Sequence, residues 1–392
     1  MVIFRVNNLA AFVMRVNPFQ HQLKFIHEAL SQPCTGNSRP VGGRSDSLNM
    51  NRSAAIDTIK AVGSQVIVLH HFSQYAPMTD WLVLAWPRLV ELIYEEGRLA
   101  VQPFLVVGGF LTAQSLSKQA GPGIAPLIWK RYLRLAPQLA VSLLLVVLAT
   151  FLLGHELDHE EWLSPLPSIG VFLAHLFFLQ DILGIESMSA GAWYVAIDLQ
   201  LFGLFVILAR VSRQLERPLS ETYAPILVAC ATVASIHVFS KSGVFDIWGI
   251  YYLSAYGLGA LVSWARESSG ARKWFWITSA LLLMDWIADP RARPILALAT
   301  ALCLYGFSHV RWSSTKTRMA RAIRYLSDVS YSTFVSHFAV IVVVSGIWES
   351  CDLYGQRAAL SFLILAWIGS LLVGSAVQTV CDQSLRKIQS GR

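Results

Sequence analysis

The chain has 392 residues, of which 55% are hydrophobic and 14% charged, and its net charge is +7. Together with a mean hydropathy of +0.51, this composition excludes an ordinary soluble protein and indicates a polytopic membrane protein. The basic excess does not indicate nucleic-acid binding, because Lys and Arg beside apolar segments are what orientation in a bilayer requires.

Residues 1–50 differ from the rest, since a short apolar stretch, Leu9–Met14, precedes a polar stretch rich in Pro and Gly. They lack the longer apolar core of a secretory signal. We predict a disordered or weakly amphipathic tail. A further hypothesis is that synthesis begins at Met50, directly before the first span; peptides from residues 1–49 in the natural protein would refute it.

The first apolar segment, residues 54–73, carries a row of polar side chains: Asp57, Lys60, Ser64 and His71. Lys60 and His71 are eleven residues apart, and eleven helical steps of about 100° return to within about 20° of the starting direction. Ionisable groups inside a span are costly in hydrocarbon. The row is therefore expected to face a polar cavity or the bundle interior, and it marks a candidate functional site.

His71 is the principal candidate for chemistry in this row. Imidazole is the side chain whose ordinary pKa suits proton transfer near neutrality. The neighbouring His70 points about 80° away from the row, and we interpret it as a helix-packing donor.

Ten apolar segments are long enough to cross a hydrocarbon core of about 30 Å. They lie at 54–73, 99–117, 132–154, 191–209, 222–239, 247–265, 274–288, 293–309, 326–347 and 358–380. An eleventh run, 169–183, is short and carries His175, Gln180 and Asp181.

The positive-inside rule decides how residues 169–183 are placed. If they do not cross and the N-terminus is cytoplasmic, 25 of the 31 Lys and Arg lie on the cytoplasmic side; if they cross, the division is 15 to 16. We therefore predict an all-α bundle of ten spans with both termini cytoplasmic, and 169–183 as a re-entrant or interfacial segment. Residues 51–382 form one membrane domain, and 383–392 form a cytoplasmic tail.

Two arginines stand at the predicted cytoplasmic entry to the third span. Arg131 and Arg134 are three residues apart, so they project from nearly one face of the helix start. Forked guanidiniums beside free backbone N–H groups suit a phosphorylated ligand. Plain positive-inside anchoring is the alternative, and by spacing alone it is favoured.

Two later spans carry further polar groups. Asp198 lies within an apolar span and needs a partner, for which Lys60 or His71 would serve. Structural ion pairing and tuning of a base both remain open for Asp198. The segment 330–338 carries His337, for which hydrogen bonding between helices is the favoured interpretation. The five cysteines show no paired spacing, so neither a disulfide framework nor a metal site is expected.

These motifs, in this order, resemble the acyltransferase 3 family of integral-membrane, acyl-CoA-dependent O-acyltransferases. The resemblance covers about residues 50–380 and rests on Lys60 with His71, Phe104–Phe110, Arg131 with Arg134 before Pro137, Trp193 with Asp198, and Tyr331 with His337. The family often has Arg in place of Lys60, Ser in place of Gly108, Glu in place of Asp198 and Phe–Tyr in place of Leu201–Phe202. Lys60 and Asp198 keep the charge of the residues they replace, but their side chains differ in length and shape. These differences affect which substrate is bound more than the class of reaction.

The resemblance implies that acyl-CoA binds from the cytoplasm with its phosphates near Arg131 and Arg134. The thioester arm would extend towards His71. Acyl-CoA is then a substrate, with acetyl as the usual acyl group, and no resident cofactor or metal is expected. The implied acceptor is a carbohydrate or cell-surface glycan, as in the O-acetylation of polysaccharides, and the expected location is the bacterial inner membrane. Nothing in the sequence indicates an oligomeric state.

Within this resemblance, His71 is the expected general base on the acceptor hydroxyl. Asp57, Asp198 or Lys60 would set its orientation and pKa, and Lys60 would alternatively neutralise developing charge or contact the donor. Ser64, Trp193 and His337 complete the candidate polar site.

Two other classes of function are open from the sequence. A proton-coupled transporter is one, because intramembrane His, Asp and Lys also build proton relays; the lack of an internal repeat mildly disfavours it. The other is a receptor or scaffold without catalysis, which predicts that His71, Asp198 and Arg131 tolerate substitution.

Overall fold

The computed structural model describes residues 53–117, 123–153, 166–215, 223–312 and 317–390. Within these ranges the chain is helical and has no strand; one isolated antiparallel bridge joins Ser53 and Arg311. The all-α fold class is confirmed for this part of the chain. The predicted N-terminal tail, residues 1–50, lies outside the described residues.

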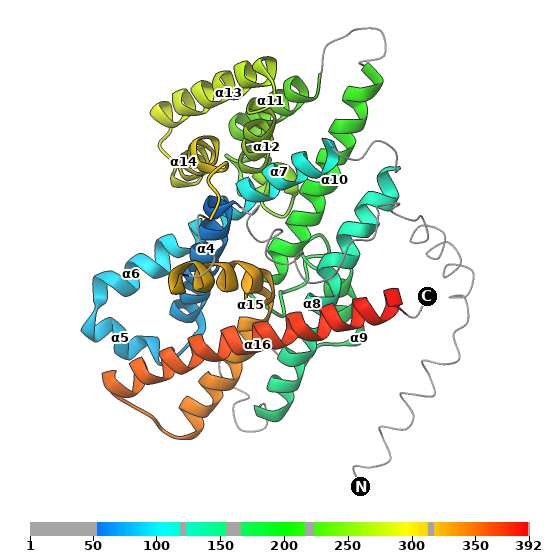
Figure 1. The fold of residues 1–392 in the computed structure, drawn as a ribbon. Coiled ribbons are helices and arrows are strands. Elements are labelled where there is room, and N and C mark those ends of the chain that lie inside the picture. The colour runs from blue at the N-terminus through cyan, green and yellow to red at the C-terminus, as the bar shows by residue number, and fades with distance from the viewer. Residues whose placement is uncertain (1–52, 118–122, 154–165, 216–222, 313–316, 391–392) are drawn as a thin grey trace. The chain divides into compact units, whose positions relative to one another are not determined.

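Each of the ten predicted spans coincides with a helix (Figure 1). The elements are α4 (Ala54–Tyr75), α5 (Thr79–Ala85), α6 (Pro87–Glu96), η1 (Gly97–Ala100), α7 (Val101–Ser117), α8 (Ile124–Leu153), α9 (Ile169–Leu176), α10 (Ala192–Leu215), α11 (Ala224–Ala234), the π-helix η2 (Ser235–Phe239), η3 (Gly243–Phe245), α12 (Gly249–Ala265), α13 (Ser269–Ala288), α14 (Ala292–Phe307), α15 (Arg318–Ser350) and α16 (Gln356–Ser390). Helix α16 thus continues into the predicted C-terminal tail.

The number of membrane crossings is supported only in part. Among the described residues, five helices are long and apolar enough to cross: Pro87–Leu116, Ile124–Leu153, Ala192–Gln214, Arg318–Ser350 and Gln356–Ser384. The other five predicted spans form α4, α11 with η2, α12, α13 and α14, and their crossing stays a prediction. Helix α9 has eight residues, about 12 Å, which is too short to span a bilayer.

Hydroxyl side chains mark three helix starts. Ser53, Ser168 and Thr317 precede α4, α9 and α15, and each accepts a hydrogen bond from the backbone N–H three residues later, at 3.2–3.5 Å. Such caps satisfy one of the backbone donors that a helix start leaves unpaired. They therefore define where α4 and α15, the two helices of the candidate site, begin.

Glycines allow α7 and α12 to touch through their backbones. A Cβ atom at Gly109 would overlap the carbonyl of Tyr256, and one at Gly259 would overlap the carbonyl of Val106. Small residues permit this close approach between membrane helices. The glycine motif of the second predicted span is thus a packing feature, and it places α7 beside the nearly fully buried α12.

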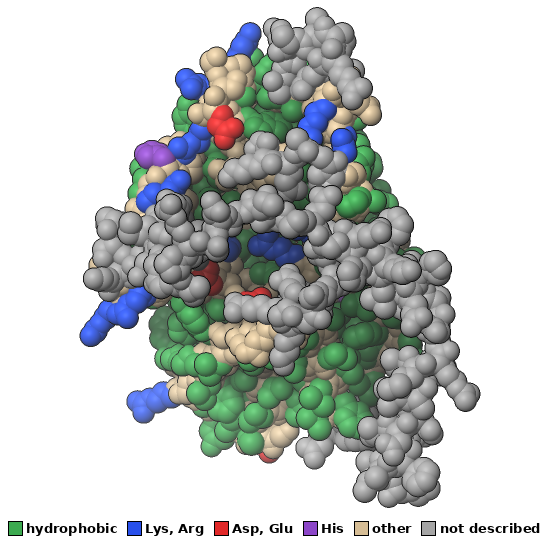
Figure 2. Space-filling model, turned by 45° about the vertical axis from the view of Figure 1, so that its right-hand side comes forward, with side chains coloured by type: hydrophobic (Ala, Val, Ile, Leu, Met, Phe, Trp, Pro, Cys, Tyr) green, Lys and Arg blue, Asp and Glu red, His purple; other side chains and the backbone are tan. Residues whose placement is uncertain are grey.

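Helix α15 lies in the interior, whereas α16 is largely exposed. In the most apolar window of each helix, 78% of α15 is buried but only 22% of α16. The two helices pack against each other, and α15 also packs against α4. Hydrophobic side chains cover a broad area of the face in Figure 2. An apolar helix that leaves most of its side chains outside the core fits contact with lipid.

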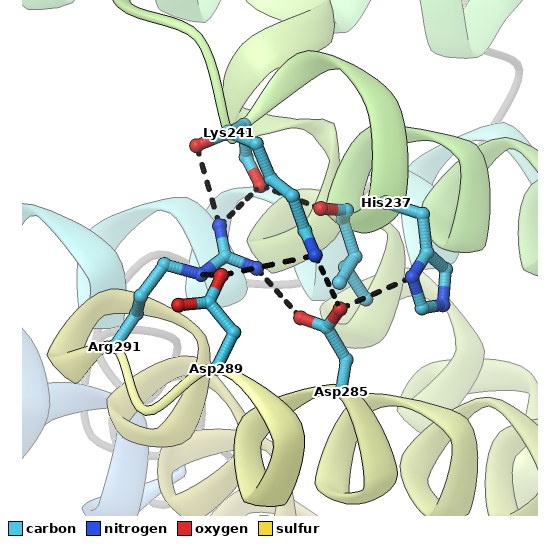
Figure 3. A network of polar contacts seen from close by, with 7 residues as sticks. His237, Lys241, Asp285, Asp289 and Arg291 are labelled. Atoms are coloured by element: carbon cyan, nitrogen blue, oxygen red, sulfur yellow. Dashed lines mark hydrogen bonds and ion pairs between the residues drawn. The ribbon is translucent and has the colours of Figure 1, made fainter.

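A charged network ties η2 and the turn after it to the last turn of α13 and the turn before α14 (Figure 3). The carboxylate of Asp285 lies 3.1 Å from Nδ1 of His237, 3.1 Å from Nζ of Lys241 and 2.6 Å from Nη2 of Arg291. Arg291 also donates to the Ser240 hydroxyl at 3.1 Å. The Asp285 side chain is 3% exposed, so its charge depends on these partners.

Replacing Asp285 with asparagine is expected to destabilise the protein by about 1.5–3 kcal/mol, the range for hydrogen bonds to charged groups. The amide removes the negative charge that Lys241 and Arg291 share. The measurement is the apparent melting temperature of the purified protein in detergent. Asp289→Asn is the matched control, because Asp289 is 49% exposed and its contacts are longer. Equal melting temperatures for Asp285→Asn and the wild type would contradict a stabilising role.

Candidate active site

Two imidazoles from distant parts of the sequence meet between α4 and α15. Nδ1 of His71 lies 2.8 Å from Nε2 of His337. The ring centroids are 4.9 Å apart, and the ring planes are 8° from parallel. Both side chains are buried. The candidate base of the first helix therefore has a histidine of α15 as its direct partner.

The hydrogen bonds around this pair assign its tautomers. Nδ1 of His337 lies 3.2 Å from the carbonyl oxygen of Thr333, which can only accept, so this nitrogen carries the proton. In a neutral His337, Nε2 then accepts the hydrogen bond from Nδ1–H of His71. The other nitrogen of His71, Nε2, keeps its lone pair, and within the described residues no hydrogen bond occupies it.

His71 also lines a cavity of about 210 Å³. The wall is built from α4, the junction of η1 and α7, the segment before α10, the start of α10 and the middle of α15. Beside α4, it includes Arg98, Ser187, Trp193 and Phe334. Pockets that enclose a whole small-molecule ligand measure about 300–1,000 Å³. The cavity therefore suits the reacting ends of two substrates better than either substrate as a whole.

His70 has the packing role that its direction predicted. Its Nδ1 lies 3.1 Å from the carbonyl oxygen of Ile93, and its Cβ is so close to Gly97 that a side chain there would collide with it. The interpretation of His70 as a helix-packing residue is confirmed. It ties α4 to α6 and η1.

Arg131 of α8 and Asp198 of α10 form a forked ion pair. Nε of Arg131 donates to Oδ2 of Asp198 at 2.9 Å, and Nη2 donates to Oδ1 at 2.7 Å. The guanidinium also lies over the ring of Phe202, 5.5 Å from its centroid. A Cβ at Gly108 would lie 3.9 Å from Oδ1 of Asp198. The pair is therefore enclosed by α7, α8 and α10.

This ion pair corrects one expectation from the sequence and bears on another. Asp198 was expected to pair with Lys60 or His71, but its partner is Arg131. Arg131 was expected to meet donor phosphates together with Arg134; that role stays a prediction, although its fork already holds a carboxylate. The reason is steric as well as electrostatic, since α8 and α10 are neighbours and a guanidinium matches a carboxylate in two hydrogen bonds.

Arg134 remains available for a ligand. Its side chain is exposed, and it forms no hydrogen bond or ion pair with another residue of the described part. It lies three residues after Arg131 on α8. Of the two predicted donor-binding arginines, only Arg134 has a guanidinium that is not already paired.

The other residues of the polar row do not surround His71. Asp57 accepts from Nε1 of Trp312 at 3.0 Å and from the Ser327 hydroxyl at 2.9 Å, and it lies fourteen residues, or about 21 Å along the axis, before His71. The expectation that Asp57 orients His71 is therefore wrong; His337 occupies that place. Ser64 is buried and donates to the Ala61 carbonyl at 3.0 Å. Lys60 is half-buried on α4.

Thr333 and Arg98 belong to the site, although neither was among the site residues predicted from the sequence. Thr333 lies four residues before His337, one helical turn away, and its carbonyl oxygen orients that ring. Arg98 borders the His71 cavity from η1. A turn-related residue before a buried histidine could have been suspected from spacing, whereas Arg98 resembled an ordinary loop cation.

A family model described as an acyltransferase domain matches residues 53–377. The match includes the histidine pair, the arginine–aspartate pair and both glycines of α7. Neither the curated proteins nor the solved structures compared with the chain include a match. The family match favours the enzyme interpretation over the transporter and the scaffold. The chain belongs to the acyltransferase 3 family, and it is a membrane acyltransferase.

Proposed function

We propose that the protein transfers an acyl group, acetyl by the family's usual preference, from cytoplasmic acyl-CoA to a hydroxyl of a carbohydrate or cell-surface glycan. The observation that supports this proposal most is the chain of hydrogen bonds from His71 through His337 to the Thr333 carbonyl. It leaves a lone pair on Nε2 of a histidine that lines a cavity. This is the requirement for a general base.

In the proposed reaction, Nε2 of His71 takes the proton of the acceptor hydroxyl as its oxygen attacks the thioester carbonyl. The new C–O bond forms, the C–S bond breaks, and the sulfur leaves as the thiolate of CoA. His71 then returns the proton to that sulfur, so the products are an ester and CoA with a free thiol. Throughout, Nδ1 of His71 keeps its hydrogen bond to His337, which holds the ring in one orientation, as the third member of a catalytic triad does.

Arg134 is the proposed contact for the phosphates of acyl-CoA. It is exposed at the end of α8 that the charge distribution predicts to be cytoplasmic. Arg131, held by Asp198, supports the donor path by fixing α8 against α10. In this proposal, Arg134 binds the donor and Arg131 holds the helix in place, although the two arginines are only three residues apart.

Arg134→Gln is expected to raise the KM for acetyl-CoA by roughly tenfold or more, because a charge-assisted hydrogen bond contributes about 1.5–3 kcal/mol. The kcat should change little, since the phosphates lie far from the reacting carbonyl. Steady-state kinetics in detergent or nanodiscs measure both constants. Lys273→Gln is the matched control, because Lys273 is also exposed and also predicted to be cytoplasmic. An unchanged KM for Arg134→Gln would refute its assignment.

The activity itself is tested with labelled acetyl-CoA in membranes that contain the protein. We expect label to appear in the glycan fraction, and mass spectrometry of that fraction to show the added acetyl group. Membranes with an empty vector give the background. Label confined to free acetate, with a well-expressed protein and the cell's own glycans present, would contradict the proposed acceptor class. Solute uptake by proteoliposomes without any acyl donor would instead favour transport.

A further inference from the structure

A second cavity, of about 280 Å³, lies next to the cavity that contains His71. The two share three lining residues, Arg98, Val101 and Trp193. Both cavities therefore border the same junction of η1 with α7 and the same start of α10. A ligand in the second cavity would lie beside the cavity that His71 lines.

Four charged side chains surround the second cavity, each from a different segment. Arg98 comes from η1, Asp181 from the turns after α9, Asp246 from the end of η3, and Arg293 from the first turn of α14. Among the described residues, no ion pair joins any of these guanidiniums to any of these carboxylates. Asp285 differs, because Lys241 and Arg291 both form ion pairs with its carboxylate.

These four groups form few hydrogen bonds, so most of their donors and acceptors are unused. Arg293 donates to the Tyr251 hydroxyl at 2.7 Å, and Asp181 accepts from the Gln180 amide at 2.9 Å. Arg98 and Asp246 have no hydrogen bond with another described side chain. Arg98 and Asp246 are exposed, and Asp181 and Arg293 are half-buried, so all four keep donors or acceptors open to a ligand that enters the cavity. Together they suit a ligand that has both hydrogen-bond donors and an anionic group.

Aromatic rings supply the apolar wall of this cavity. The rings of Trp193 and Tyr252 lie 5.8 Å apart, with planes at 37°, and both line the cavity. Apolar walls with a few convergent polar groups are typical of sites for small organic ligands. A ring with apolar C–H faces and polar edges fits such a wall.

We propose that the second cavity binds the acceptor, and that the acceptor is a hydroxyl-rich ring carrying an oxyanion, either a carboxylate or a phosphate. Arg98 and Arg293 bind the oxyanion, and Asp181 and Asp246 accept hydrogen bonds from hydroxyls. Because Arg98 borders both cavities, the anionic group lies near the boundary and the reacting hydroxyl reaches the His71 cavity. The inference rests on the proposed function, and it adds the charge of the acceptor and the residues that select it.

The test is a binding measurement in which no acyl donor is present. Calorimetry on the full-length protein in nanodiscs compares methyl glycosides of gluco, galacto and manno configuration, each as the neutral hexoside, the hexuronide and the 6-phosphate. We expect at least one hexuronide or 6-phosphate to bind at least tenfold more tightly than its neutral partner. A preference for the hexuronide identifies a carboxylate, and one for the 6-phosphate identifies a phosphate.

Arg98→Gln and Arg293→Gln are each expected to abolish that preference, and Asp181→Asn to weaken binding of charged and neutral probes alike. Arg88→Gln, which removes an exposed arginine of α6 outside both cavities, should leave the preference intact. If no charged probe binds more tightly than its neutral partner, or if Arg98→Gln and Arg293→Gln both keep the preference, the inference is overturned. Selective binding without acyl transfer would contradict the proposed function alone, and transfer without selectivity would contradict this inference alone.

Discussion

Replacing His71 with alanine is expected to lower acyl transfer by about 10²–10⁴-fold, the usual contribution of a positioned general acid or base. The loss should appear in kcat, because the imidazole acts on the proton that moves in the transition state. The KM for acetyl-CoA should stay near the wild-type value. Transfer from labelled acetyl-CoA by purified protein measures both constants.

His70→Ala is the matched control for this prediction. It removes an imidazole from the adjacent position of the same helix and from the wall of the same cavity, but one whose Nδ1 bonds the Ile93 carbonyl. Its kcat should remain within a few-fold of the wild type if the protein is folded. Wild-type turnover by a folded His71→Ala protein would remove His71 from the chemistry.

Variants of His337 separate positioning from direct catalysis. His337→Leu removes the acceptor for Nδ1–H of His71. We expect kcat to fall by about 10–100-fold, by analogy with the loss of partners that orient metal-bound histidines. His337→Gln offers a side-chain oxygen in its place, so it should retain more activity than His337→Leu. If the two variants are equally impaired and equally stable, the hydrogen bond from His71 to His337 does not orient the base.

The second large effect concerns stability. Asp198→Ala leaves the guanidinium of Arg131 without its carboxylate in a largely apolar setting, and breaking a buried ion pair costs about 3–5 kcal/mol. Because the Arg131 side chain is 21% exposed, we expect the lower end of that range. The measurement is the fraction of folded protein and its melting temperature by fluorescence-detected size exclusion.

The double variant Arg131→Met with Asp198→Leu is the decisive control for the ion pair. Apolar replacement of both partners is often neutral or stabilising, so the double variant should be more stable than Asp198→Ala. If Asp198→Ala is as stable as the wild type yet inactive, the carboxylate acts in the chemistry, as one sequence interpretation held. If the double variant is the least stable, the pair is not the reason for the loss.

Helical structure was predictable because hydrophobic runs of span length leave the backbone few alternatives in a bilayer. The ten segments therefore coincide with helices of the structure. Whether all of them cross is less accessible from sequence, since α11, α12 and α14 are short. Short helices can cross, tilt or end inside the protein, and hydropathy alone does not distinguish these cases.

The candidate site was predictable to a smaller extent. The separation of eleven residues placed Lys60 and His71 on one face of the helix. Because an ionisable side chain inside a span is costly in hydrocarbon, His71 became a candidate for the catalytic base. The identity of its partner could not follow, because His337 lies on another helix 266 residues later. Equally, Lys60 and His71 were the two partners expected for Asp198, and only the packing of α8 against α10 brings Arg131 to it instead.

The sequence by itself determined which residues are too polar for their span, and so which side chains need partners. It also determined the family, because the motifs occur in a fixed order along the chain. Only the tertiary structure decided which polar side chains are partners, since partners depend on which helix faces meet. That choice assigns the tautomer of His71, commits Arg131 to Asp198, and leaves Arg98, Asp181, Asp246 and Arg293 around a cavity without ion pairs between them.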